Sequence, residues 1–216
     1  GCLFFMKKTS HNLLVILILI LGIVTGCEKQ ENVVPPKETV TEEIKGEKII
    51  GDDIGLGEHQ IALNDLYAEI PYRKEQVNLY KRVENETIII DIRDKDSNKL
   101  LFTYGEKLSK SNQKLVYREI KLKKSKIKLI ATLELNPISH KITVMNQPTI
   151  EILSDTEKIE TEFISAVSRS GDYPTEEVEV LANLTLINEN YDREDIYEGY
   201  LLGVVKTDTN VLGAVQ

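Results

Sequence analysis

The sequence has few of the residues that usually carry chemistry, because its 216 residues include only two cysteines and three histidines. If the first 26 residues are removed on export, only Cys27, His59 and His140 remain. The two histidines are far apart in the sequence and have no cysteine nearby, which argues against a zinc site. No Gly-x-Ser-x-Gly motif is present, and a single cysteine cannot form an internal disulfide. These absences predict a protein without a cofactor and without enzyme activity.

Long hydrophobic runs are also missing. The longest one, residues 13–24, has twelve apolar residues, whereas a membrane-spanning helix needs about 20. Lys7 and Lys8 precede this run, in the order of charge and apolar residues that is typical of an export signal. We therefore predict a cleaved signal peptide over residues 1–26. Since a signal of this kind would begin at Met6, we expect residues 1–5 to lie upstream of the true start.

The end of the apolar run is the most specific motif in the chain. Val24, Thr25 and Gly26 precede Cys27, so that a branched apolar residue and two small residues stand before a cysteine. This motif resembles the lipobox of bacterial lipoprotein precursors. The resemblance covers the first 27 residues. It implies cleavage after Gly26, a diacylglycerol on the sulfur of Cys27, a further acyl chain such as palmitate on its amino group, and a place on the extracytoplasmic face of the cell membrane.

A charged segment follows the cysteine. Residues 28–48 contain almost no large apolar side chains, and Pro35 and Pro36 stiffen their centre. This composition predicts a flexible tether, so that residues 27–48 form the lipidated N-terminus and its spacer. A β-rich extracytoplasmic domain is expected over residues 49–206, and a loose tail over residues 207–216.

Alternation of apolar and polar residues predicts strands in most of this domain. In residues 126–135, for example, Ile127, Leu129 and Leu133 share one face, and Lys126 and Lys128 share the other. Turn-forming residues separate the runs. The predicted strands are residues 77–83, 87–92, 99–104, 126–135, 138–144, 178–186 and 198–205. Many short strands favour an antiparallel β-sandwich or a barrel-like domain.

Two segments have less regular patterns. Residues 59–70 fit a short helix loosely, ended by Pro71, and we predict one there. Residues 154–169 fit a helix, because Ile159, Phe163 and Val167 recur every four residues, but they also fit a strand. The β-branched residues and the neighbouring strands favour the strand.

Charge is unevenly distributed along the chain. Residues 137–216 carry 15 acidic and 5 basic residues, and the whole chain has a net charge of −8. This acidity argues against binding to nucleic acid. Residues 107–128, in contrast, contain nine basic residues and one acid, Glu119.

The basic stretch predicts an anion patch. Its last five lysines would flank a tight turn at Ser125: Lys121, Lys123, Lys124, Lys126 and Lys128. Like charges at the end of a hairpin repel one another unless an anion or an acidic surface neutralises them. Two alternatives remain open. The lysines are solvated and attracted to the acidic last third of the chain, or they bind lipid headgroups, an anionic wall polymer or an acidic protein partner.

Two acidic clusters are weak candidates for a metal site. Asp94, Asp96 and Asn98 have the spacing of a calcium loop, but Lys99 and Gly105 replace the glycine and the glutamate that such a loop needs. The second cluster contains Asp192, Glu194, Asp195 and Glu198. Acids at such positions are more often solvated, so we predict no metal site.

The sequence therefore predicts a non-catalytic, lipid-anchored binding or interaction module at the bacterial envelope. Its expected partners are the membrane, through the lipid on Cys27, and an anionic polymer, lipid headgroup or protein. The alternative is an envelope enzyme or a module that uses a divalent metal at residues 192–198. The sequence does not indicate an oligomeric state.

Overall fold

The fold consists of two antiparallel β-sheets in the computed structural model of this chain. The structure describes residues 43–50, 56–144, 146–154 and 157–205. Within these ranges the chain forms thirteen strands and one short 3-10 helix, η1, over Lys74–Gln76. The prediction of a mainly β fold is confirmed.

The larger sheet has eight strands, with the spatial order β1-β4-β5-β6-β7-β8-β10 and with β9 also paired to β8. Each strand runs antiparallel to its neighbours. The bounds are β1 Glu47–Lys48, β4 Val77–Glu84, β5 Thr87–Asp94, β6 Leu100–Lys107, β7 Gln113–Leu122, β8 Ser125–Leu135, β9 Ile142–Val144 and β10 Thr149–Ser154.

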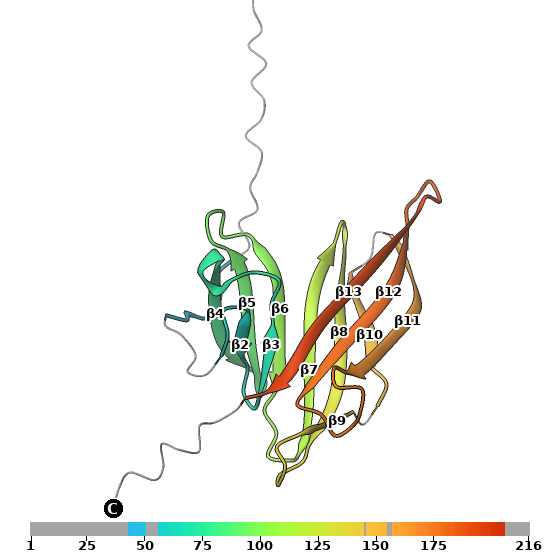
Figure 1. The fold of residues 1–216 in the computed structure, drawn as a ribbon. Helices are drawn as coiled ribbons and strands as arrows, with labels where there is room; N and C mark the ends of the chain where they lie inside the picture. Colours follow the sequence, from blue (N-terminus) through green and yellow to red (C-terminus); the bar gives the residue numbers. More distant parts are fainter. Residues whose placement is uncertain (1–42, 51–55, 145, 155–156, 206–216) are drawn as a thin grey trace, which may run out of the picture. The chain divides into compact units, whose positions relative to one another are not determined.

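The smaller sheet has five strands in the order β11-β12-β13-β3-β2. All of its pairings are antiparallel. The bounds are β2 Gln60–Ala62, β3 Leu66–Glu69, β11 Lys158–Ser168, β12 Glu177–Ile187 and β13 Arg193–Val204. In Figure 1, β13 (red) runs across β7 and β8 of the larger sheet.

Side chains that alternate along the strands make the two sheets pack face to face. The core contains every second residue of β8, such as Leu129, and of β12, such as Val180 and Leu184. Lys126 and Lys128 alternate with the buried residues of β8 and are partly exposed. Neither sheet closes on itself among the described strands, so the sandwich describes this fold better than the barrel.

Polar contacts also join the sheets through the core. The Tyr104 hydroxyl of β6 donates to the carbonyl oxygen of Glu69 in β3 at 3.1 Å, and the Tyr200 hydroxyl of β13 donates to that of Leu129 in β8 at 3.2 Å. The Tyr104 and Tyr200 rings lie edge to face, with centroids 5.6 Å apart. Burial raises the pKa of Tyr104 to about 12. Both hydroxyls are therefore satisfied at a buried position, which aromatic residues with a polar end require.

The prediction of a helix over residues 59–70 is wrong. The segment forms β2 and β3, which pair with each other, and β3 also pairs with β13. Its buried residues are spaced by two on each side of a turn: Ile61 and Leu63, then Leu66, Ala68 and Ile70. Because Asn64 and Asp65 form that turn, the apolar residues on its two sides have a combined spacing that imitates a helix.

The strand predicted over residues 138–144 is shorter than expected, because only β9 (Ile142–Val144) is extended. The side-chain oxygen of Asn136 accepts the backbone N–H groups of Ile138 and Ser139, both at 2.9 Å, and so forms a turn. His140 has a φ of 51° and is exposed. Ile138 and His140, which the predicted strand included, thus lie in the turn before β9, and Ile138 is 89% exposed.

The ambiguous segment 154–169 is a strand over most of its length, as we favoured. β11 pairs with β12 from Lys158 to Ser168 and has a bulge between Thr161 and Phe163. A bulge inserts one residue and shifts the alternation by one position. Ile159 and Ile164 therefore pack against the core, whereas Phe163 and Val167, which follow Ile159 at helical steps, are exposed.

Candidate ligand-binding end of the sandwich

The β7–β8 hairpin turn places the predicted lysines at one end of the sandwich. Its turn residues are Lys123 and Lys124, and not Ser125, which is buried as the first residue of β8. Lys123 has a φ of 52°, as a two-residue hairpin turn requires. Lys121 is the cross-strand partner of Lys126, so two like charges face each other below the turn.

Most of these lysines have an acidic partner. Glu119 lies 2.8 Å from the Nζ atom of Lys126 and 3.2 Å from that of Lys128, which also lies 4.5 Å above the ring of Tyr117. Burial alone would raise the pKa of Glu119, but hydrogen bonds and attraction from the two lysines outweigh it and lower the pKa below its usual value. The single acid of the basic stretch therefore neutralises two of its cations.

Lys123 joins this hairpin to the acidic part of the chain. It forms an ion pair with Glu194 at the start of β13. Lys121 and Lys124 make no ion pair with any residue that the structure describes, so an anion patch would be centred on them. The five lysines of the predicted patch thus divide into three paired cations and two that face solvent.

The acidic cluster at residues 192–198 is separated by the geometry of β13, because successive side chains point to opposite faces of a strand. Asp195 accepts from the hydroxyl of Thr185 at 2.9 Å on the outer face. Glu198 faces the core and lies 3.7 Å from Arg118 of β7, while burial raises its pKa. In the described part of the chain no group of three or more His, Cys, Asp or Glu side chains could hold a metal ion.

The calcium-like spacing at residues 94–98 serves the β5–β6 turn. The side-chain oxygen of Asp94 accepts from the backbone N–H of Ser97 at 2.8 Å and from its hydroxyl at 2.6 Å. These hydrogen bonds lower the pKa of Asp94. Asn98 has a φ of 57° and adopts the left-handed conformation that asparagine tolerates. Two of the three candidate ligands are therefore used to shape the turn.

A third feature at this end was not found from the sequence. The β12–β13 turn is organised by Asn188, whose side-chain oxygen accepts the backbone N–H groups of Asn190 at 2.8 Å and Asp192 at 3.0 Å. The Asn188 amide nitrogen donates to the Asp192 carboxylate at 3.0 Å. The backbone N–H of Tyr191 donates to the carbonyl oxygen of Asn188 at 3.0 Å. This turn therefore holds Tyr191 in a fixed place, with a φ of 63° and 86% of the residue exposed.

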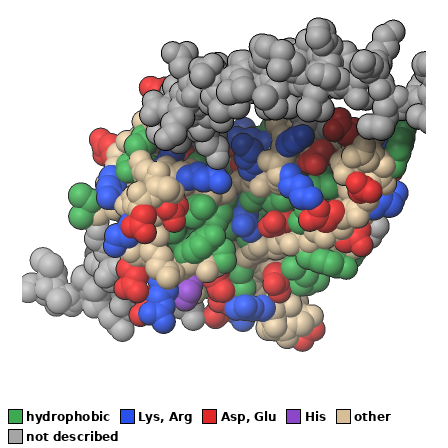
Figure 2. Space-filling model, turned by 90° about the horizontal axis from the view of Figure 1, so that it is seen from above, with side chains coloured by type: hydrophobic (Ala, Val, Ile, Leu, Met, Phe, Trp, Pro, Cys, Tyr) green, Lys and Arg blue, Asp and Glu red, His purple; other side chains and the backbone are tan. Residues whose placement is uncertain are grey.

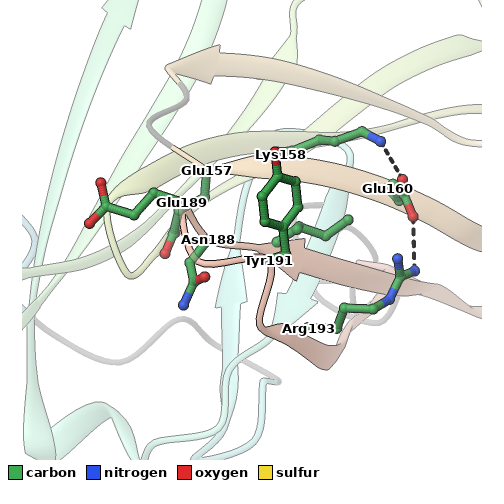
Figure 3. A pocket seen from close by; sticks show the side chains of 8 residues that line it. Glu157, Lys158, Glu160, Asn188, Glu189, Tyr191 and Arg193 are labelled. Atoms are coloured by element: carbon green, nitrogen blue, oxygen red, sulfur yellow. Dashed lines mark hydrogen bonds and ion pairs between the residues drawn. The ribbon is translucent and has the colours of Figure 1, made fainter.

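A hollow of about 380 Å³ lies between this turn and the start of β11. On one side Glu160 accepts from Lys158 at 2.5 Å and from Arg193 at 2.9 Å. These two hydrogen bonds lower the pKa of Glu160. Figure 3 shows Tyr191 between this charged group and the side chains of Glu157 and Glu189. The hollow combines an exposed ring with donors and acceptors, and its volume is within the usual range of ligand sites.

Both turns lie at the upper end of the view in Figure 1, and the Lys123–Glu194 ion pair joins the strands that carry them. Figure 2 looks onto this end and shows basic and acidic side chains interspersed on the visible surface. The signal that could have found the hollow is the run Asn188 to Asp192, which separates two predicted strands and is rich in turn-forming residues. A single tyrosine in such a turn has no recognisable pattern.

Some predicted features lie outside the described residues. These are the signal peptide, Cys27, most of the tether and the tail over residues 207–216. No helix in the described ranges is long and apolar enough to cross a membrane. No protein-family model, curated protein or solved structure matches this chain.

Proposed function

We propose that this chain is a lipid-anchored, non-catalytic binding module on the extracytoplasmic face of a bacterial cell membrane. The lipobox-like residues Val24 to Cys27 support the anchor, because two acyl chains hold a protein on a membrane without a spanning helix. The observation that carries the binding role is the preformed β12–β13 turn, in which Asn188 fixes an exposed Tyr191 beside a hollow. Loops at the end of a rigid sandwich are a common place for binding sites.

The anchor is tested by lipid labelling. The full-length chain is expressed in a bacterium that is fed an alkyne-bearing palmitate analogue. Wild-type protein should take up the label, and Cys27→Ser should take up none. Cys2→Ser is the matched control and should be labelled like the wild type. Equal labelling of the wild type and Cys27→Ser would contradict the proposed anchor.

The binding role is tested by sedimentation with isolated envelope polymer from which membranes have been extracted. Detergent-solubilised full-length protein should bind saturably. Asn188→Ala should weaken this binding, because it removes the side-chain hydrogen bonds that hold the turn. Asn78→Ala, which changes an amide in β4, should bind like the wild type. A wild-type protein that stays in the supernatant at all concentrations would contradict the binding role.

A further inference from the structure

The ring of Tyr191 is an unusual surface feature, because a large aromatic group is held in solvent by ordered backbone contacts. Its turn is fixed by the hydrogen bonds of Asn188, so the ring is presented at little further cost in conformational entropy. A second exposed tyrosine, Tyr197, lies further along β13 and does not line the hollow. Tyr191 therefore offers an apolar face that a ligand can cover, beside polar groups that can orient it.

The acidic side of the hollow lacks hydrogen-bond donors. Neither carboxylate oxygen of Glu157 accepts a hydrogen bond from a described residue, and because Oε2 is shielded from solvent, a ligand in the hollow can reach only Oε1. Glu189 lies on the same side of the hollow. A ligand with hydrogen-bond donors, such as hydroxyl groups, can therefore bond to both carboxylates.

The cations of the hollow already have a partner. Lys158 and Arg193 both bond to Glu160, so an anionic ligand would have to compete with Glu160 and approach Glu157 as a like charge. A cationic ligand could reach Glu157, but it would lie close to Lys158 and Arg193. An uncharged ligand with many hydroxyl groups avoids both conflicts, since it donates to the carboxylates and accepts from the remaining N–H groups.

We infer that this hollow binds a neutral saccharide, with one sugar ring stacked on Tyr191 and its hydroxyl groups donating to Glu157. The C–H groups on the face of a sugar ring complement an aromatic surface, and its hydroxyl groups both donate and accept. This inference rests on the proposed binding role and names its ligand as envelope glycan rather than protein or lipid.

The test is an array of neutral, anionic and cationic oligosaccharides, together with tetralysine. It uses full-length lipidated protein in a detergent without a sugar headgroup. We expect binding to neutral oligosaccharides. Titration of the best of them should show at least a tenfold loss of affinity for Tyr191→Ala and a smaller loss for Glu157→Gln. The control Tyr197→Ala, which removes a tyrosine of β13 that is 78% exposed and does not line the hollow, should bind within twofold of the wild type.

Three results would overturn the inference: no neutral oligosaccharide is bound, only charged probes are bound, or Tyr191→Ala and Tyr197→Ala behave alike. If no oligosaccharide of the array is bound while the protein still sediments with envelope polymer, the proposed saccharide site is refuted and the proposed binding role is still supported. If the protein binds neither an oligosaccharide nor the envelope polymer, the proposed binding role is refuted as well.

Discussion

The buried pair of Arg118 and Glu198 predicts how strongly the two sheets depend on each other. Arg118 reaches from β7 to β13, where one guanidinium nitrogen donates to the carbonyl oxygen of Gly199 at 2.6 Å. The guanidinium also lies 4.7 Å from the centre of the Phe102 ring. Only 9% of the Arg118 side chain is exposed, against 23% for Glu198. The negative charge of Glu198 is therefore balanced by Arg118, a residue of the opposite sheet.

Replacing Arg118 with methionine keeps much of its apolar stem and removes its charge. The variant loses a charged hydrogen bond and leaves a poorly solvated carboxylate without a counter-charge. Breaking a buried pair from one side costs about 3–5 kcal/mol, which is a large part of the 5–15 kcal/mol that stabilises a typical domain. We expect Arg118→Met to lower the free energy of unfolding by about 3 kcal/mol or more at pH 7.

The double variant Arg118→Met/Glu198→Leu separates the effect of an unpaired charge from the effect of lost side-chain packing. It removes both charges, so we expect its stability to lie within about 2 kcal/mol of the wild type. The assay is urea unfolding of the full-length chain, followed by far-ultraviolet circular dichroism, with an unchanged m-value as the check that both states are comparable. A double variant no more stable than Arg118→Met would refute the reasoning.

The loss of stability in Arg118→Met should depend on pH, and the pKa of Glu198 predicts the direction. Burial raises the pKa of Glu198, and the charge of Arg118 partly opposes the rise. A carboxyl group whose pKa is higher in the folded state takes up a proton on folding, so its folded state loses stability as the pH rises through that pKa. Without Arg118 the pKa should rise further. The deficit of Arg118→Met should thus shrink from pH 7 to pH 5, and a deficit independent of pH would contradict the role of Glu198.

Two further predictions concern packing and charge. Gly203→Ala should lower the free energy of unfolding in urea by about 1–3 kcal/mol, because the new Cβ would lie only 2.2 Å from the Tyr67 ring. In the control Gly57→Ala the new Cβ meets nothing closer than 3.6 Å, so the free energy of unfolding should fall by less than about 0.5 kcal/mol. Lys121→Gln/Lys124→Gln should weaken retention of the non-lipidated full-length chain on phosphatidylglycerol vesicles by about 2 kcal/mol, roughly thirtyfold, and unchanged retention would end the anion-patch hypothesis.

The strands could be predicted wherever alternation is unbroken and the turn has suitable residues. β8 and β12 keep one register over their whole length, so every second residue is buried, as the sequence indicates. The turn after β4 was also predictable, because Asn85, with a φ of 46°, belongs to a residue type that tolerates this conformation. These features depend on local chemistry, which a single sequence contains.

Elements that depend on a distant partner could not be predicted. β2 and β3 are three and four residues long and are stabilised by pairing with each other and with β13, more than a hundred residues later. The bulge in β11 changed the apparent period of that strand. Short strands and bulges are determined by tertiary pairing, and their local patterns therefore imitate a helix.

Charge is the property that the linear sequence describes least well in this fold. Alternation turns Lys114 and Arg118 of the basic stretch towards the interior, where Lys114 pairs with Asp65 and Arg118 contacts β13. A run of nine basic residues is therefore not a patch of nine charges. The same argument applies to the acidic cluster at residues 192–198, because Asp195 and Glu198 lie on opposite faces of β13. A binding site in such a sandwich is consequently better sought where a turn fixes side chains of different chemistry beside a hollow, as Asn188 does for Tyr191, than where one charge is most frequent.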